Sequence, residues 1–228
     1  EPAKPKRMLF QTNEKLGKIP KNGSDITDFL LAIEEGAYGN YENMQELAGY
    51  IKQFVAPGTK FNYTDANVKG RVVNGTDLYI NPENIDSNED LAVTFMHEVV
   101  HVLTSNFIND NVGNDGQPLE NAAAEVISLN NVRNAYTDHL KETYGKEFTD
   151  FMAKFDKYNA LKVKGQDTSE VSFSRKEINI FYPSVNLKEF SATSLGNNKE
   201  YKKEAKKVKY LESNKDILQK TAEIITKI

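Results

Sequence analysis

Apolar side chains recur at helical spacing in two early segments of the chain, residues 24–35 and 42–55. Positions three and four residues apart lie on one face of a helix, so each segment predicts a helix with one buried face. The first segment also starts with a Ser-Asp pair suited to capping a helix N-terminus. The apolar positions are Ile26, Phe29, Leu30, Ile33, Met44, Leu47, Ile51 and Phe54. We therefore predict two packed helices here.

Three short β-favouring runs follow a Pro-Gly break, at residues 60–64, 70–73 and 77–80. Gly and Asn residues separate the runs, which is typical of tight connections within a sheet. The run 77–80 is a candidate edge strand that could pair with an extended peptide, and the alternative is an ordinary sheet strand. The pattern predicts a small β-sheet.

An unusually apolar helix is predicted after the sheet, from about residue 87 to residue 106. The Ser-Asn-Glu-Asp run at its start resembles a capping box. Two further long helices are predicted at residues 119–144 and 148–163, beyond a polar loop that contains glycine. We expect a β-like or irregular stretch ending at Tyr182, and then three short helices.

These elements predict an α+β fold, mainly helical, with a small β-sheet preceding the helix of residues 87–106. The chain length suits one sizeable core. Residues 1–23 are rich in Pro, Lys, Gly and Asn, which predicts a flexible arm or linker. We therefore expect one domain over residues 24–228, ending in C-terminal helices.

Composition and charge narrow the classes of function. The chain has 228 residues, no cysteine and a formal net charge of −4, from 29 basic and 33 acidic residues. Without cysteine, any metal would be held by His and carboxylate ligands. The charge balance makes a nucleic-acid partner unlikely on global grounds. The run 199–209 contains six Lys and two Glu, and could contact an anionic partner or form a solvated helix surface.

No run of about 20 apolar residues stands out, and the first residues lack the apolar core of a signal peptide. We expect a soluble chain without a membrane partner, and the sequence does not indicate its compartment. Because the sequence starts at Glu1 and not at methionine, it is compatible with a piece of a longer precursor.

A His-Glu-x-x-His motif lies in the middle of the predicted apolar helix and contains two of the three His residues of the chain. His97 and His101 are four positions apart, so both imidazoles can reach one ion, and Glu98 can reach a water on that ion. Zinc suits such ligands. Two alternatives stay open: an amphipathic helix with coincidentally stacked His residues, and a structural or degenerate metal site.

Catalytic zinc needs a third protein ligand, and the sequence lacks the Gly-x-x-His continuation of metzincins. The candidates are Glu120, Glu125, His139 and Glu189. Glu125 would lie on a helix that follows the motif, as the ligand of gluzincins does, and its alternative is a solvated helix face. Glu189 comes three residues after Asn186, so its alternative is the N3 position of a capping box.

The runs at residues 97–104 and 186–192 together resemble the zincin-like peptidase domains of large multidomain proteins of phages and mobile elements. The resemblance implies a zincin-like fold. It also implies a Glu-Phe-x-Ala segment that supplies the third zinc ligand, which here falls on Glu189.

Three further positions bear on this resemblance. Tyr182 and Asn197 lie where the family pattern expects them, whereas Thr193 stands where the family often has a second acidic residue. Tyr182 or Tyr201 could donate a hydrogen bond to a developing oxyanion, and the alternative for each is a packed surface aromatic side chain.

The sequence thus predicts a zinc-dependent metallopeptidase acting on a peptide or protein substrate. Zn²⁺ would be held by His97, His101 and Glu189, with Glu98 as the general base of a metal-activated water and Tyr182 as a further catalytic residue. One alternative is a non-catalytic zincin-scaffold module for binding or assembly in a larger phage-type protein. Another is a helical protein that binds anions or nucleic acid through the Lys cluster.

Overall fold

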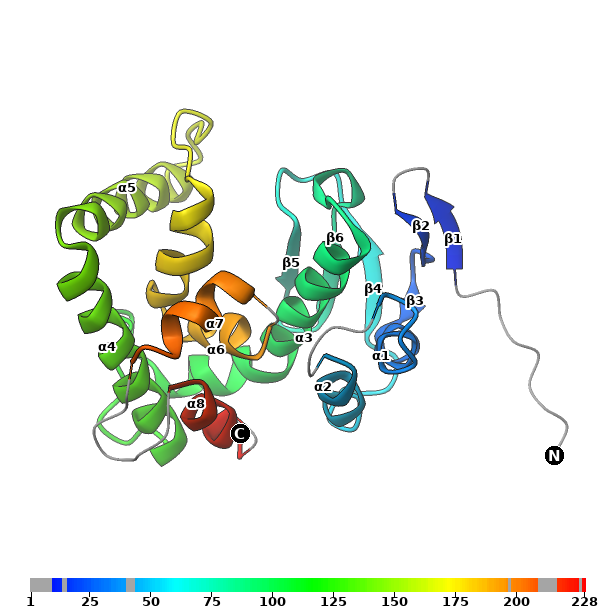
Figure 1. Cartoon of the computed structure of the whole chain (residues 1–228), viewed down its shortest axis with the longest axis horizontal. Helices are drawn as coiled ribbons and strands as arrows, with labels where there is room; N and C mark the ends of the chain where they lie inside the picture. Colours follow the sequence, from blue (N-terminus) through cyan, green and yellow to red (C-terminus); the bar gives the residue numbers. More distant parts are fainter. Residues whose placement is uncertain (1–9, 14–15, 40–43, 197, 209–216, 226) are drawn as a thin grey trace, which may run out of the picture. The chain divides into compact units, whose positions relative to one another are not determined.

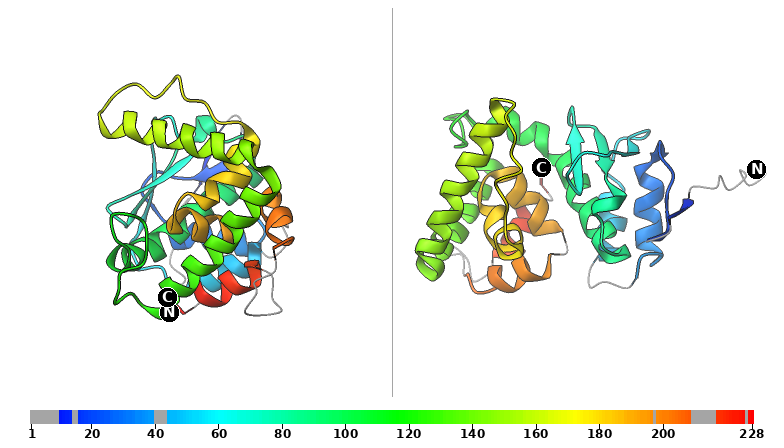
Figure 2. Two further views of the ribbon diagram at one scale, coloured as in Figure 1. Left: turned by 90° about the vertical axis from the view of Figure 1, so that its left-hand side faces the viewer. Right: turned by 90° about the horizontal axis from the view of Figure 1, so that it is seen from above.

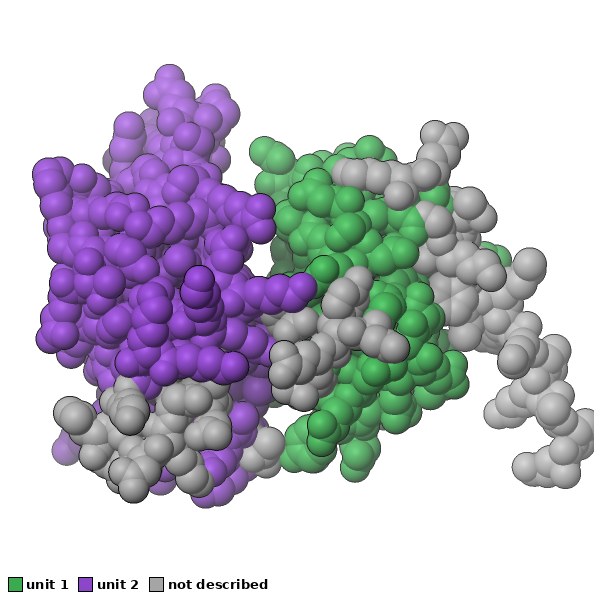
Figure 3. Space-filling model, viewed as in Figure 1, with its two compact units in different colours: residues 1–106 green, residues 107–228 purple. Residues whose placement is uncertain are grey.

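The computed structural model describes residues 10–13, 16–39, 44–196, 198–208, 217–225 and 227–228. The fold is α+β and mainly helical, with a small mixed sheet that precedes the motif helix, as the sequence predicts. The chain divides into two compact units, residues 1–106 and 107–228 (Figure 3). Each unit is described separately below.

The first unit contains a two-stranded and a four-stranded sheet with helices (Figure 1). Its strands are β1 (Phe10–Asn13), β2 (Gly17–Pro20), β3 (Ser24–Asp25), β4 (Lys60–Tyr63), β5 (Gly70–Val73) and β6 (Asp77–Ile80). Its helices are α1 (Ile26–Glu34), α2 (Met44–Ile51), the 3-10 turn η1 (Pro82–Asn84) and most of α3 (Asn88–Asn111), whose last five residues belong to the second unit. The hairpin of β1 and β2 falls in the segment predicted as an arm or linker.

The order of the four-stranded sheet corrects the predicted edge strand. The order is β3-β4-β6-β5, with β4 parallel to β6 and the other pairs antiparallel. The run 77–80, predicted as a candidate edge, is therefore an inner strand, and β5 lies at the edge. Strand order depends on long-range pairing, which the period-2 pattern of a single run does not encode.

The core of the first unit lies between one face of the sheet and two helices. Phe29 of α1 contacts both Phe61 of β4 and Phe95 of α3, with ring centroids 5.7 Å and 4.1 Å away. Side chains alternate between the two faces of a strand, so the side chain of Phe61 lies on one face of the sheet. Because α1 and α3 both contact Phe61, the two helices lie on that same face (Figure 2). Leu78 and Ile80 of β6 are fully buried. This packing holds the motif helix against the sheet.

Helix α3 is long and apolar enough to cross a membrane by length and composition alone, although the sequence analysis predicts no membrane-spanning segment. Its most apolar 18-residue window has a mean hydropathy of 1.3, and 61% of that window is buried inside the structure. The core helix of a soluble protein can meet the same criteria. The burial of Phe95, Met96 and Val99 makes α3 a core helix of this fold.

The second unit is helical. Its elements are α4 (Ala124–Tyr144), α5 (Lys146–Val163), the π-helical turn η2 (Glu177–Phe181), the 3-10 turn η3 (Tyr182–Ser184), α6 (Leu187–Leu195), α7 (Lys199–Ala205) and α8 (Ile217–Ile225). The three predicted C-terminal helices are thus present. The stretch ending at Tyr182 contains no strand: residues 171–174 are irregular, as one predicted alternative has it, and residues 175–181 are helical. Phe181 packs there in an aromatic cluster with Phe148 and Phe151, which favours the helical turn over an extended strand.

Candidate metal centre

Helix α3 brings the two motif histidines together. The Nε2 atoms of His97 and His101 lie 3.1 Å apart, and the ring planes are inclined by 81°. The side chains stack one turn apart because residues i and i+4 share a helix face. His101 is buried and His97 is half-buried. The rings therefore converge through the nitrogen that usually binds metal, as the sequence motif predicts.

The spacing of this pair fits a tetrahedral zinc ion. Two nitrogens that each lie about 2.0–2.1 Å from such an ion are about 3.3–3.4 Å apart. The observed 3.1 Å between the Nε2 atoms is close to that value. A small rotation of either ring would reach it, so the donor set fits zinc in both chemistry and spacing.

Glu98 is buried, with 6% of its surface exposed, and lies beside edge strand β5. A Cβ atom at Gly70 would lie 2.7 Å from Cγ and 2.8 Å from Oε1 of Glu98. Gly70 pairs with Ile80, whose buried side chain shares the helix-facing side of the sheet. The absent side chain at Gly70 therefore makes room for the Glu98 carboxylate. The sequence analysis did not single out Gly70, although a glycine within a strand is a signal of close approach.

The close approach predicts that Gly70→Ala moves the Glu98 carboxylate. The added methyl would collide with Cγ, an atom near the backbone, so the side chain cannot yield simply by turning its far end. A displacement of about 1 Å at a reacting group can cost about 10²-fold in rate. For the zinc-dependent peptide cleavage that the sequence predicts, we expect kcat to fall by about that factor, with the zinc content unchanged.

Gly49→Ala is the matched control, because a Cβ there would lie 2.6 Å from Oε1 of Glu34, a carboxylate outside the motif. Both substitutions thus crowd a Glu side chain in the same unit. We expect Gly49→Ala to retain its cleavage rate. Equal rates for Gly70→Ala and the unmodified chain would show that Gly70 does not position Glu98.

Strand β5 also presents backbone groups at the sheet edge. The N–H of Asn81 donates to the carbonyl oxygen of Lys69 at 2.9 Å, so position 69 faces β6. Hydrogen-bonding direction alternates along an antiparallel strand, and the N–H and C=O groups of Gly70 and Val72 consequently face away from β6. Among the described residues, no strand pairs with that side of β5. The edge next to Glu98 therefore offers donors and acceptors suited to an extended chain.

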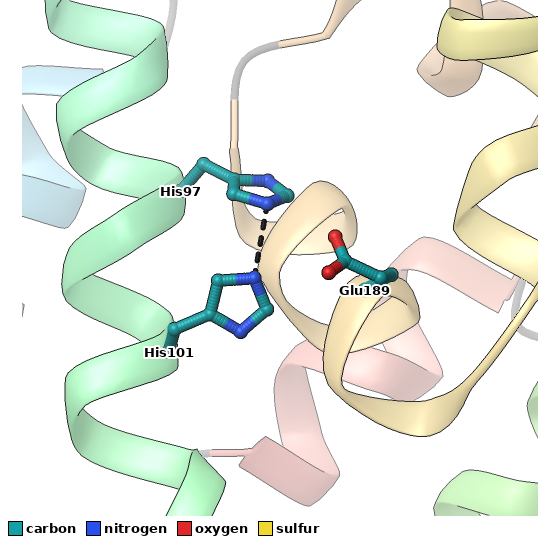
Figure 4. A group of neighbouring side chains, drawn as sticks. All are labelled: His97, His101 and Glu189. Atoms are coloured by element: carbon teal, nitrogen blue, oxygen red, sulfur yellow. Dashed lines mark hydrogen bonds between the residues drawn. The ribbon is translucent and has the colours of Figure 1, made fainter. Parts of the chain in front are cut away.

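Glu189 lies on the first turn of α6 in the second unit. Its backbone N–H donates to Oδ1 of Asn186 at 2.9 Å, which is the cap predicted as the alternative role of this position. The cap engages the backbone of Glu189, so it does not by itself prevent the carboxylate from binding a metal. Figure 4 draws this carboxylate with the two imidazoles, as a group that could hold a metal ion. Because Glu189 belongs to the second unit, its role as a ligand is treated as a proposal.

The other candidate ligands are not part of this group. Glu120 is exposed, and Glu125 lies half-buried on the first turn of α4. His139 instead pairs with Glu204, with 2.7 Å between Nε2 and Oε1. Burial favours a raised pKa for Glu204, but hydrogen bonds from Lys207, His139 and Tyr144 outweigh it and lower the pKa. His139 therefore takes part in a buried polar network of the second unit.

The two candidate tyrosines differ in their surroundings. Tyr201 is fully buried, its hydroxyl lies 2.6 Å from Oγ of Ser194, and burial raises its pKa. It is a core residue, and not the packed surface aromatic of its alternative interpretation. Tyr182 is half-buried in η3 and packs edge-on against Phe155, with ring centroids 5.7 Å apart. Its catalytic role stays a prediction.

Three features of the sequence remain to be located: Thr193, Asn197 and the Lys-rich run 199–209. Thr193 is buried within α6, and Asn197 and Lys209 lie outside the described residues. In the Lys-rich run, Lys207 pairs with Glu204 at 2.7 Å. The described part of that run thus contributes to the polar network around Glu204.

Comparison with known proteins identified no similar protein. No protein-family model, curated protein or solved structure matches this chain.

Proposed function

We propose that this chain is a zinc-dependent metallopeptidase of the zincin type. The observation that carries the proposal is the convergence of the His97 and His101 Nε2 atoms, 3.1 Å apart, beside the buried Glu98. The helix places two imidazoles at a spacing suited to zinc, and a carboxylate lies between them in the sequence. These are the ligands and the general base that hydrolysis by a metal-activated water requires. Glu189 is proposed as the third ligand.

Each residue has a distinct role in the proposed reaction. His97, His101 and Glu189 would hold the ion, which when bound supplies a Lewis acid for the scissile carbonyl and the attacking water. The Glu98 carboxylate takes a proton from that water as it attacks the carbonyl carbon. It then passes the proton to the leaving amine as the C–N bond breaks, so the base is regenerated. The products are a carboxylic acid and an amine.

Edge strand β5 is the proposed binding place for the substrate chain. An extended peptide that pairs with Gly70 and Val72 would continue the sheet through main-chain hydrogen bonds. Gly70 borders both this edge and Glu98, so a peptide bond held there would lie near the general base. This replaces the run 77–80 of the sequence analysis as the strand that receives substrate.

Removal of zinc is the test of the proposed function. We expect the zinc-loaded chain to cleave casein and a mixture of fluorescence-quenched peptides, and a chelator to reduce cleavage to background. Zinc added after removal of the chelator should restore cleavage, because the imidazole and carboxylate ligands of the proposed site can rebind it. The measurements are cleavage rate and zinc per chain.

The result also separates the proposal from its alternative. One bound zinc without cleavage of any tested peptide would favour a non-catalytic scaffold. Cleavage that continues at full rate in the stripped protein would contradict the metallopeptidase proposal.

A further inference from the structure

Helix α4 of the second unit buries two polar side chains on one face. Asn130 and Arg133 are 6% and 8% exposed, and they lie three positions apart, about one turn. The same face carries Val126, Leu129 and Tyr136, all fully buried. A guanidinium group in such surroundings is costly unless a hydrogen-bonded partner of opposite charge accompanies it.

Arg133 lacks that partner in the described structure. Its Nε has no hydrogen-bond partner, and its Nη2 donates only a long bond of 3.4 Å to Oδ1 of Asn134. Burial lowers its pKa. Arginine nevertheless stays protonated in proteins. The Nε and Nη2 atoms form one edge of the buried, positively charged guanidinium. On this edge the Nε N–H has no hydrogen-bond partner, and Nη2 makes only the one long bond.

Asn130 adds an unpaired acceptor to the same place. Its Nδ2 donates to Oε1 of Gln117 at 3.3 Å, whereas its Oδ1 has no partner. Gln117 is exposed and belongs to the loop in which Val112 and Pro118 form a β-bridge. An exposed side chain can turn aside at little cost, so Gln117 is a movable cover over Asn130.

We propose that Arg133 and Asn130 form a carboxylate-binding site. A carboxylate matches the planar fork of arginine with two parallel hydrogen bonds and neutralises its charge. Oδ1 of Asn130 would accept a hydrogen bond from a donor next to the carboxylate. The carboxylate can come from a free small acid or from the end of a peptide, whose last residue carries an N–H beside its carboxylate.

Thermal unfolding of the metal-stripped protein, after removal of the chelator, tests this site separately from the zinc proposal. At constant ionic strength, N-acetylglycine should raise the Tm in a saturable way, by about 3–5 °C at ten times its Kd. Acetate offers the carboxylate without the N–H, and N-acetylglycinamide offers the N–H without the charge. We expect no shift with the amide.

Arg133→Met removes the fork and is expected to abolish the Tm shift. Its own Tm should equal or exceed that of the unmodified chain, since an apolar residue can replace an uncompensated buried charge without loss. Arg133→Lys keeps a charge but loses the planar fork, so it should show a smaller Tm shift than the unmodified chain. This second variant tests the site even where the Met variant does not fold. Arg175→Met is the matched control, because the exposed Arg175 lies outside α4, and it should retain the full shift.

The outcomes distinguish the sources of the ligand. A larger shift with N-acetylglycine than with acetate supports a peptide end, and equal shifts that disappear in Arg133→Met support a free acid. No saturable shift in the unmodified chain, or the same shift in Arg133→Met, would overturn the proposal and leave the polar atoms to solvent.

Discussion

Replacing Glu98 by Gln is expected to lower the kcat of peptide cleavage by about 10²–10⁴-fold, the usual contribution of a general acid–base group. The amide keeps the size of the side chain, so the close contact with Gly70 is preserved. It cannot take a proton from water at neutral pH. Because Glu98 is not among the proposed ligands, zinc content should stay at the level of the unmodified chain.

Glu89→Gln is the matched control, since Glu89 lies in the first turn of the same helix, away from the motif. It removes the same charge and should leave kcat unchanged. Cleavage that survives in Glu98→Gln at the original rate would exclude Glu98 as the base. Loss of zinc in that variant would instead show that Glu98 supports metal binding.

Replacing Glu189 by Ala is expected to weaken zinc binding by more than about 10²-fold. Removal of a residue that only supports a metal ligand already costs 10–100-fold in affinity, and loss of a ligand should cost more. The two histidines alone would leave zinc with too few protein ligands for a catalytic site. Competition with a chromophoric chelator measures the affinity directly.

Glu125→Ala provides the comparison, because Glu125 is the other carboxylate on a first helical turn that the sequence nominates. We expect it to bind zinc as tightly as the unmodified chain. The reverse pattern, with affinity lost only in Glu125→Ala, would transfer the third-ligand role to Glu125. The backbone cap at Asn186 is unaffected by Glu189→Ala, so α6 should still form.

Local sequence patterns predicted most of the elements. Strands β4, β5 and β6 fall within one residue of the predicted runs, because alternation and glycine punctuation act over a few positions. Helix ends were less accurate: α3 extends to Asn111 and α4 begins only at Ala124. Ala123 donates its N–H to Oδ1 of Asn111, which ties the intervening loop to the end of α3. A contact across twelve positions lies beyond any local pattern.

The sequence alone determined that the imidazoles of His97 and His101 meet, since their i, i+4 spacing needs only a helix to bring them together. Tertiary structure decided which strand lies at the sheet edge and that Gly70 makes room for Glu98, because both depend on the pairing of distant segments. It also decided that Arg133 is buried with no counterion in the described part of the chain, a state that no residue spacing predicts. The periodicity of apolar residues specifies which face of a helix or strand is buried. Tertiary packing specifies which residues of other elements contact that face.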